Sequence, residues 1–156
     1  MDWRKNWLYP GDSQSRTFAD VVQRIKECED STVYVGCDSH AAKGIQDKYL
    51  FAIAICILSN TGNTYFYSRG IHIKKFQSLQ ERLTEEVALS VDTASCLMEL
   101  LPNKKITLHA DSNIDPKHKS AKFTDIFRNW AKGIGCEFAS KPDAWASSSI
   151  ADKHSK

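Results

Sequence analysis

Two aspartates stand where apolar, β-branched segments end, and a carboxylate in such a place can take part in chemistry. Asp38 ends the segment 31–38, and Asp111 follows the segment 106–110. Ligands of open α/β sheets bind outside the carboxyl ends of the strands, so these two carboxylates meet if their strands are neighbours. Aspartate is also common in turns, and for either residue taken alone a turn cap is the simpler explanation.

Two further acids lie on segments with helical periodicity. Glu86 borders the apolar side of the pattern over residues 76–101, whereas Glu85 faces nearly opposite to it. Asp152 lies in the last helical segment, 143–154. The simpler explanations are that Glu86 forms a surface salt bridge and that Asp152 belongs to a solvated polar tail. Together with the two strand-end aspartates they form a cage of oxygen ligands, which suits two Mg²⁺ or Mn²⁺ ions that clamp an attacking water and a leaving oxygen.

Basic side chains near these acids are candidates for proton transfer or phosphate contact. His109 precedes Asp111 by two residues and therefore shares its face of the strand. His154 and Lys153 follow the last acid, and Lys141 precedes the last helix. Histidine titrates near neutral pH and lysine can neutralise developing charge. A hydrogen-bonded structural role explains His109 at least as well, and a solvated surface position explains Lys141.

Cysteines and tryptophans offer weaker signals. The five cysteines are odd in number and scattered, which is typical of reduced packing residues. Cys37 beside Asp38 could be a nucleophile, but a small buried residue in a strand is the better interpretation. The tryptophans at positions 3, 7 and 145 could stack on bases, although core or helix-docking aromatics are commoner.

The elements that must position these residues follow from periodicity and turn signals. We predict strands over residues 31–38, 49–58, 64–69, 106–110 and 136–140, and helices over 17–29, 76–101, 120–133 and 143–154. In the helix over 120–133, we expect Phe123, Ile126, Phe127 and Trp130 to face inward.

The order of these elements predicts an α/β fold. Three strands joined by tight turns pair antiparallel, whereas strands separated by helices form parallel crossovers in the same sheet. We therefore expect a mixed five-stranded sheet flanked by helices, as a single domain over residues 1–156 in which residues 1–30 form an N-terminal helical extension.

Composition sets outer limits on function. Hydrophobic residues make up 42% of the 156 positions, enough for a core, and the formal net charge of +2 neither demands nor excludes a polyanionic partner. The longest apolar run is far shorter than a membrane span, and the start does not have the pattern of a signal peptide. A cytoplasmic protein without membrane attachment is the expectation.

Four segments carry a resemblance to a known family. They are VGCDSH (35–40), RLTEEVALS (82–90), LHADSN (108–113) and KPDAWASSSIADKHSK (141–156). Their succession resembles the ribonuclease H-like superfamily over residues 32–156. More narrowly, they are similar to the YkuK family of ribonuclease H-like proteins, with the last segment as the most specific.

The resemblance implies a site, a cofactor and an activity. Its metal ligands would be Asp38, Glu86, Asp111 and Asp152, with helical phase selecting Glu86 over Glu85. The activity would be metal-dependent hydrolysis of phosphodiester bonds in RNA, DNA or a hybrid, with water attacking in line to leave a 3′-hydroxyl and a 5′-phosphate. The alternative is a nucleic-acid-binding module that keeps the fold without turnover, and the presence of all four acids favours the enzyme.

Overall fold

The computed structural model describes residues 5–113, 117 and 121–156. Trp3 and the expected helix start at Ser120 lie outside the described residues. In chain order the elements are α1 (Phe18–Glu27), β1 (Thr32–Ala41), β2 (Lys48–Ser59), β3 (Gly62–Ile73), α2 (Leu79–Leu100), β4 (Ile106–Asn113), α3 (Ala121–Gly133), β5 (Glu137–Lys141), the π-helix η1 (Ala146–Ala151) and α4 (Asp152–His154).

The strands form one mixed sheet in the order β3-β2-β1-β4-β5. β1, β2 and β3 pair antiparallel, and β4 joins β1 in parallel, with β5 parallel to β4. The predicted α/β architecture is therefore confirmed. β1 and β3 are longer than expected because the antiparallel pairing continues into polar sequence, as far as Ala41 opposite Tyr49 and Ile73 opposite Lys48.

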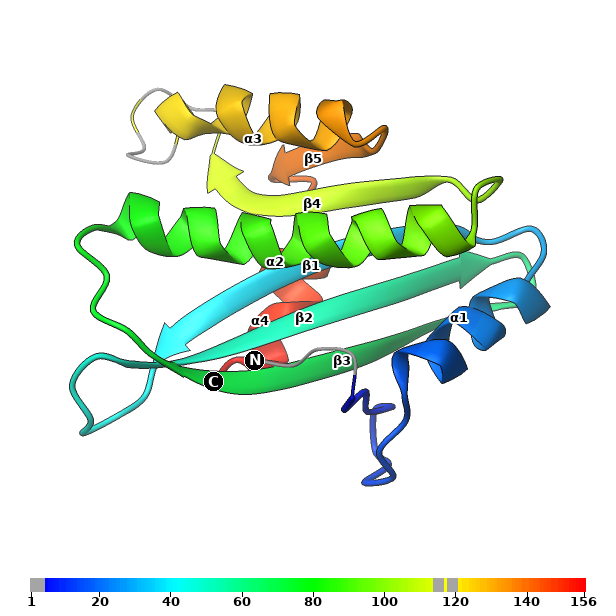
Figure 1. Ribbon diagram of the computed structural model, residues 1–156, viewed down its shortest axis with the longest axis horizontal. Helices are drawn as coiled ribbons and strands as arrows, with labels where there is room; N and C mark the ends of the chain where they lie inside the picture. The colour runs from blue at the N-terminus through cyan, green and yellow to red at the C-terminus, as the bar shows by residue number, and fades with distance from the viewer. Residues whose placement is uncertain (1–4, 114–116, 118–120) are drawn as a thin grey trace.

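Helices cover both faces of this sheet (Figure 1). The larger core lies between the sheet and α1, α2 and α3, and it takes Val33 and Val35 of β1 and the isoleucines of β2. A smaller cluster on the other face takes the alternate residues Ala54 and Cys56, which pack against η1. Strand alternation therefore sends the odd-numbered side chains of β1 toward α2 and the even-numbered ones toward η1 and α4.

The exposed face of α3 differs from the expectation. Phe127 is buried and Phe123 packs partly against the core, but Ile126 is 58% exposed and Trp130 is 37% exposed. The helix sits over β4 and β5 near the edge of the sheet, where it needs only a narrow apolar stripe. The prediction that all four residues point inward is wrong for Ile126 and Trp130.

The last helix docks on β1 through a position without a side chain. A Cβ added at Gly36 would lie 2.5 Å from the backbone nitrogen of Ser147 and 2.7 Å from the carbonyl carbon of Ala146. Only glycine allows this approach, so the η1 backbone rests directly on the strand. The segment begins near Trp145 without a side-chain cap, rather than at residue 143 as predicted, and most of it is a π-helix. Within the described residues, no helix has the length and apolar character needed to cross a membrane.

Candidate metal centre

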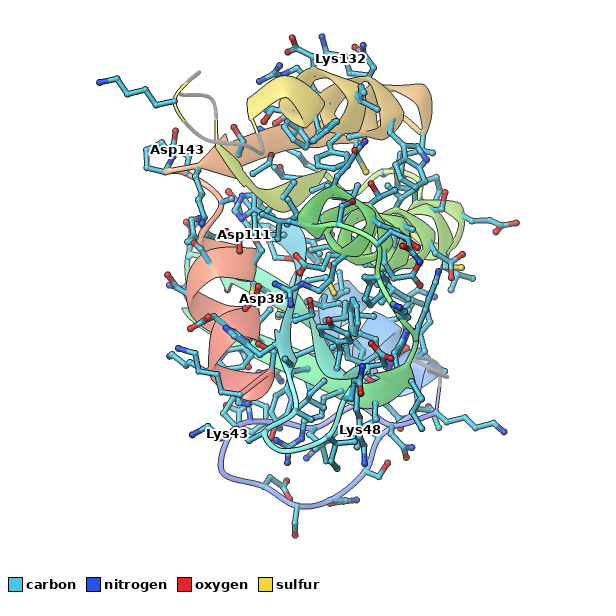
Figure 2. The ribbon with its side chains drawn as sticks, turned by 90° about the vertical axis from the view of Figure 1, so that its left-hand side faces the viewer. Asp38, Lys43, Lys48, Asp111, Lys132 and Asp143 are labelled. Carbon is cyan, nitrogen blue, oxygen red and sulfur yellow. The ribbon has the colours of Figure 1, made fainter. Side chains whose placement is uncertain are left out.

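The site forms where two parallel strands separate. β1 and β4 are paired from Val33 with Ile106 up to Gly36 with His109, and the pairing stops there. Asp38 and Asp111 lie two residues beyond the last pair on their strands. The opening between the strands lets side chains from both faces of the sheet approach the same point, and Figure 2 shows Asp38 and Asp111 between the two helical layers. Asp38 and Asp111 thus lie inside β1 and β4, just beyond the end of the β1–β4 pairing, and not at the ends of the strands as predicted.

Glu86 reaches this point from α2. The helix lies across β1 and β4, and Glu86 is turned toward the sheet with only 4% of its surface exposed. Ser39 Oγ donates a hydrogen bond of 2.6 Å to Glu86 Oε2. The other oxygen, Oε1, is buried without a hydrogen-bond partner among the described residues. Glu85, which we expected to face nearly opposite to the apolar side, is half-buried, and Glu86 is the more buried of the two.

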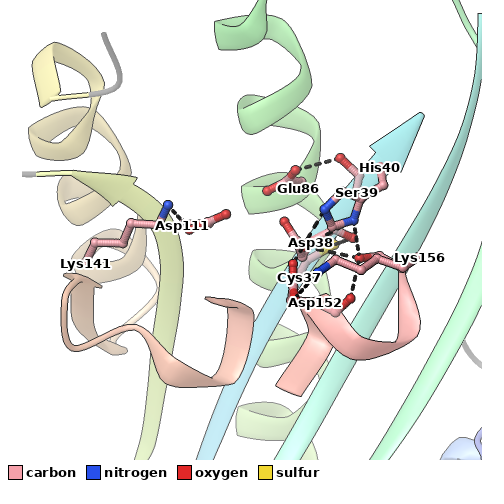
Figure 3. A network of polar contacts seen from close by, with 10 residues as sticks. Cys37, Asp38, Ser39, His40, Glu86, Asp111, Lys141, Asp152 and Lys156 are labelled. Atoms are coloured by element: carbon pink, nitrogen blue, oxygen red, sulfur yellow. Dashed lines mark hydrogen bonds and ion pairs between the residues drawn. The ribbon is translucent and has the colours of Figure 1, made fainter. Parts of the chain in front are cut away.

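Asp152 arrives from the opposite face, at the start of α4 (Figure 3). His40 Nε2 lies 3.5 Å from Asp152 Oδ1, and His40 Nδ1 lies 3.5 Å from Asp38 Oδ2. Ser155 stands beside both groups, with its Oγ 2.8 Å from His40 Nδ1 and 3.1 Å from Asp38 Oδ2. Residues 152–156 and the carboxyl-terminal part of β1 therefore form one polar network.

Two lysines balance the outer acids. Lys141 Nζ lies 2.9 Å from Asp111 Oδ1, and Lys156 Nζ lies 3.0 Å from Asp152 Oδ2. Both ammonium groups come from half-exposed or exposed side chains. The buried acids Asp38 and Glu86 have no lysine or arginine ion pair among the described residues. The positive charge of the protein thus stays at the rim of the cluster.

The potential ligand atoms fall into two groups that share one residue. Asp38, Glu86 and Asp111 each present an oxygen within 4.8 Å of the others, and so do the ligand atoms of Asp38, His40 and Asp152. The first group offers only carboxylates, whereas the second includes an imidazole. Asp38 belongs to both.

Burial and mutual repulsion govern how these acids hold their protons. Burial raises the pKa of Asp38 to about 7, and the charge of Asp111 adds to the rise. Burial likewise raises the pKa of Glu86 well above its usual value, with a further contribution from Asp38. For Asp152, burial acts upward, but hydrogen bonds from Lys156 and Asp38 hold its pKa below the usual value. Among the described residues no lysine or arginine forms an ion pair with Asp38 or Glu86, and a bound cation would relieve their repulsion.

The structure does not bring the two candidate histidines to the acids. His109 Nδ1 accepts a 3.0 Å hydrogen bond from the backbone N–H of Ala146, and its ring contacts Tyr34 and Trp145. Burial lowers the pKa of His109 to about 4, so the ring is neutral at physiological pH. His154 stacks on Tyr67 and meets the hydroxyl of Tyr65. These placements give both rings a structural role and do not support the expected proton transfer.

The other expected residues are placed as follows. Lys153 is exposed on α4. Trp7 is buried in the core and Trp145 is half-buried against Tyr34, so both are packing residues here. Cys37 is buried on the α2 side, and burial raises the pKa of its thiol, which opposes a role as nucleophile.

Sequence reasoning missed His40, Ser39 and Ser155. A signal for His40 was present, because it follows Asp38 by two residues and so lies on the same face of a strand. Ser39 and Ser155 carry no signal of their own, since serine is common on surfaces and in turns.

Comparison with known proteins gives one family. The Ribonuclease H-like family model matches residues 16–156. Among curated proteins, no sequence matches the chain. Among solved structures, the chain matches that of prototype foamy virus protease-reverse transcriptase, at 12% sequence identity and a TM-score of 0.40. That match covers 81% of this chain but only 20% of the viral chain. Because the family model matches residues 16–156, which is most of the chain, the chain belongs to the ribonuclease H-like family.

Proposed function

We propose that this protein is a nuclease that hydrolyses phosphodiester bonds of RNA or DNA with two divalent cations, Mg²⁺ or Mn²⁺. Asp38, Glu86, Asp111 and Asp152 are the proposed carboxylate ligands. Family membership supports a nuclease-like role and contact with nucleic acid. The similarity of residues 35–40, 82–90, 108–113 and 141–156 to the YkuK family supports a place for the chain in that narrower group.

One observation carries the proposal. The carboxylate of Glu86 is buried beside Asp38 and Asp111, and one of its oxygens has no hydrogen-bond donor among the described residues. An unpaired buried carboxylate is costly, so a fold keeps one only where something compensates it. Hard divalent cations prefer such oxygen donors, and the donor set therefore fits them.

The two ligand groups match two cation positions. Glu86 and Asp111 would help to hold one ion and Asp152 the other, and Asp38, which belongs to both groups, would take part in both positions. When bound, the ions supply Lewis acidity that makes water a stronger nucleophile and neutralises charge on the phosphate. Ser39 fixes Glu86 and Ser155 fixes Asp38, so the ligands are oriented before any ion arrives.

Lysines at the rim would hold the substrate. Lys141 is paired with Asp111 in this structure, and a cation on Asp111 would release its ammonium group for a phosphate oxygen. Lys153 projects from α4 into solvent and is a second candidate for phosphate contact.

The neighbouring glutamates of α2 allow a matched test. We expect the wild-type protein to cleave labelled single-stranded, duplex or hybrid nucleic acid in Mg²⁺ or Mn²⁺ and to stop when EDTA is added. Glu86→Gln should lower the cleavage rate by at least about 100-fold, because it removes the charge and one oxygen of a proposed ligand at the site of chemistry. Glu85→Gln, one residue away on the same helix, should cleave at the wild-type rate.

Other outcomes would change the assignment. Binding of nucleic acid without metal-dependent cleavage of any substrate would show a binding module that has the fold but not the activity. Equal cleavage rates for Glu85→Gln and Glu86→Gln would contradict the role of Glu86 as a metal ligand and, with it, the proposed carboxylate site.

A further inference from the structure

His40 occupies a place that the four-acid site does not explain. Its ring lies between Asp38 and Asp152, with a nitrogen 3.5 Å from an oxygen of each, and it completes the second ligand group. We propose that His40 Nε2 is itself a ligand in the second cation position, and that Ser155 is the positioning residue that orients the ring. This inference rests on the proposed function, because it assigns an additional ligand to the same site.

Hydrogen-bond donors and acceptors select the nitrogen that is free to bind. Ser155 Oγ has one proton to donate, and its acceptors are Asp38 Oδ2 and the carbonyl oxygen of Asp152, each at 3.1 Å. If Ser155 donates to either of these oxygens, it is the acceptor in its 2.8 Å contact with His40 Nδ1, and Nδ1 then carries the proton. A neutral ring protonated at Nδ1 has its lone pair on Nε2. Metal-binding histidines use this arrangement, in which the second nitrogen donates to a fixed oxygen.

The lone pair of Nε2 faces another acceptor. Asp152 uses Oδ2 for its ion pair with Lys156 and presents Oδ1 to His40 Nε2 at 3.5 Å. With a lone pair on Nε2 the two acceptors repel each other, and a cation between them would relieve that repulsion. Two atoms that each lie about 2.1 Å from one ion are about 3 to 4 Å apart, so this separation suits a shared ion.

An imidazole ligand changes which ion the position prefers. Mg²⁺ favours an all-oxygen environment, whereas imidazole is a better ligand for divalent transition metals than for Mg²⁺. The group of Asp38, Glu86 and Asp111 offers oxygen alone, but the group of Asp38, His40 and Asp152 adds nitrogen. The two positions would therefore differ, with Mn²⁺ held in the second even when Mg²⁺ is in excess.

Pulsed electron paramagnetic resonance of the full chain loaded with Mn²⁺ tests the ligand directly. We expect a ¹⁴N coupling of directly bound imidazole in the wild-type protein, still present in excess Mg²⁺. The same protein made with ¹⁵N-labelled histidine should lose the ¹⁴N signal, a comparison that needs no variant. Absence of any histidine nitrogen coupling while Mn²⁺ is bound overturns the inference.

Variants separate a ligand from an ion-pair partner. His40→Asn should remove the nitrogen coupling and weaken Mn²⁺ binding by at least about 10-fold, whereas His72→Asn, which alters another partly buried histidine, should change neither. Ser155→Ala should weaken Mn²⁺ binding by about 10- to 100-fold while the coupling of His40 persists. If His40 were instead a protonated partner of the two aspartates, His40→Asn would bind Mn²⁺ as tightly as wild type or more tightly, which overturns the inference.

The same samples distinguish this inference from the proposed function. Metal-dependent cleavage with no nitrogen coupling leaves the nuclease proposal standing and removes only His40 as ligand. A wild-type protein that binds no Mn²⁺ in the titration contradicts both.

Discussion

At the scale of single residues, the acid cluster sets how the stability of the metal-free protein depends on pH. The pKa of Asp38 is raised to about 7 by burial and by Asp111. A carboxyl whose folded-state pKa is raised stabilises the fold below the unfolded pKa of about 4, and that contribution is lost as pH rises through the folded pKa. The cluster should therefore destabilise the metal-free protein increasingly between about pH 4 and pH 7.

Asp38→Asn tests this dependence. In EDTA, the wild-type protein should lose more unfolding free energy between pH 5 and pH 8 than the variant does, by on the order of 1–3 kcal/mol. Denaturant unfolding at both pH values measures the difference. Parallel pH profiles for the two proteins would contradict the assignment of Asp38 as a buried, repelled carboxyl.

His109 should show the opposite sign. Burial lowers its pKa to about 4, so its neutral form stabilises the fold above the unfolded pKa of about 6.5, and that contribution is lost as pH falls toward 4. His109→Gln keeps an acceptor for the N–H of Ala146 but cannot titrate. On acidification from pH 7 to pH 4, we expect the wild-type protein to lose on the order of 2 kcal/mol more unfolding free energy than this variant. Denaturant unfolding followed by circular dichroism at each pH measures the difference.

At the scale of elements, the docking of η1 on β1 positions Asp152 and Ser155. Gly36→Ala would place a methyl group against the backbone of Ser147, and backbone cannot yield as a flexible side chain can. We expect a loss of about 1–3 kcal/mol in unfolding free energy and weaker Mn²⁺ binding. Gly133→Ala is the matched control, because a Cβ there meets nothing within 4 Å. Calorimetry should show destabilisation for Gly36→Ala alone; similar Tm values for the two variants would show that η1 tolerates displacement.

The elements were predictable where periodicity is strong, and the site only in part. The alternation in β1 and β2 and the apolar stripe of α2 follow from the burial of one face, which the sequence records directly. The helical phase correctly separated Glu86 from Glu85. The π-helical turn could not be anticipated, because it depends on the fit of η1 against Gly36 rather than on local preference.

The same limit explains the histidines. His109 was expected beside Asp111 because of strand alternation, but the strand is irregular between His109 and Asn113. The His109 ring instead accepts a hydrogen bond from the first residue of η1. Strand alternation could also have placed His40 beside Asp38, because the two residues are two positions apart in β1. Whether a histidine faces a ligand or supports a neighbouring backbone depends on tertiary contacts that spacing alone does not contain.

At the scale of the whole molecule, cation binding should stabilise the fold. A ligand that binds only the folded state adds about 2.7 kcal/mol when its concentration is 100 times its Kd. For a chain of this size, that corresponds to a rise in Tm of about 5–10 °C. Thermal denaturation in EDTA and in Mn²⁺ measures the shift, and the Asp38→Asn/Asp111→Asn double variant should show almost none. A wild-type Tm indifferent to Mn²⁺ would contradict the site.

The wide separation of the four acids along the chain has a consequence for dissected forms of the protein. Asp38, Glu86, Asp111 and Asp152 belong to β1, α2, β4 and α4, so no single element holds more than one of them. A peptide bond cut in the turn between β2 and β3 would divide the donors between two fragments. Manganese would then be retained only while the fragments stay associated, and its release would report their dissociation.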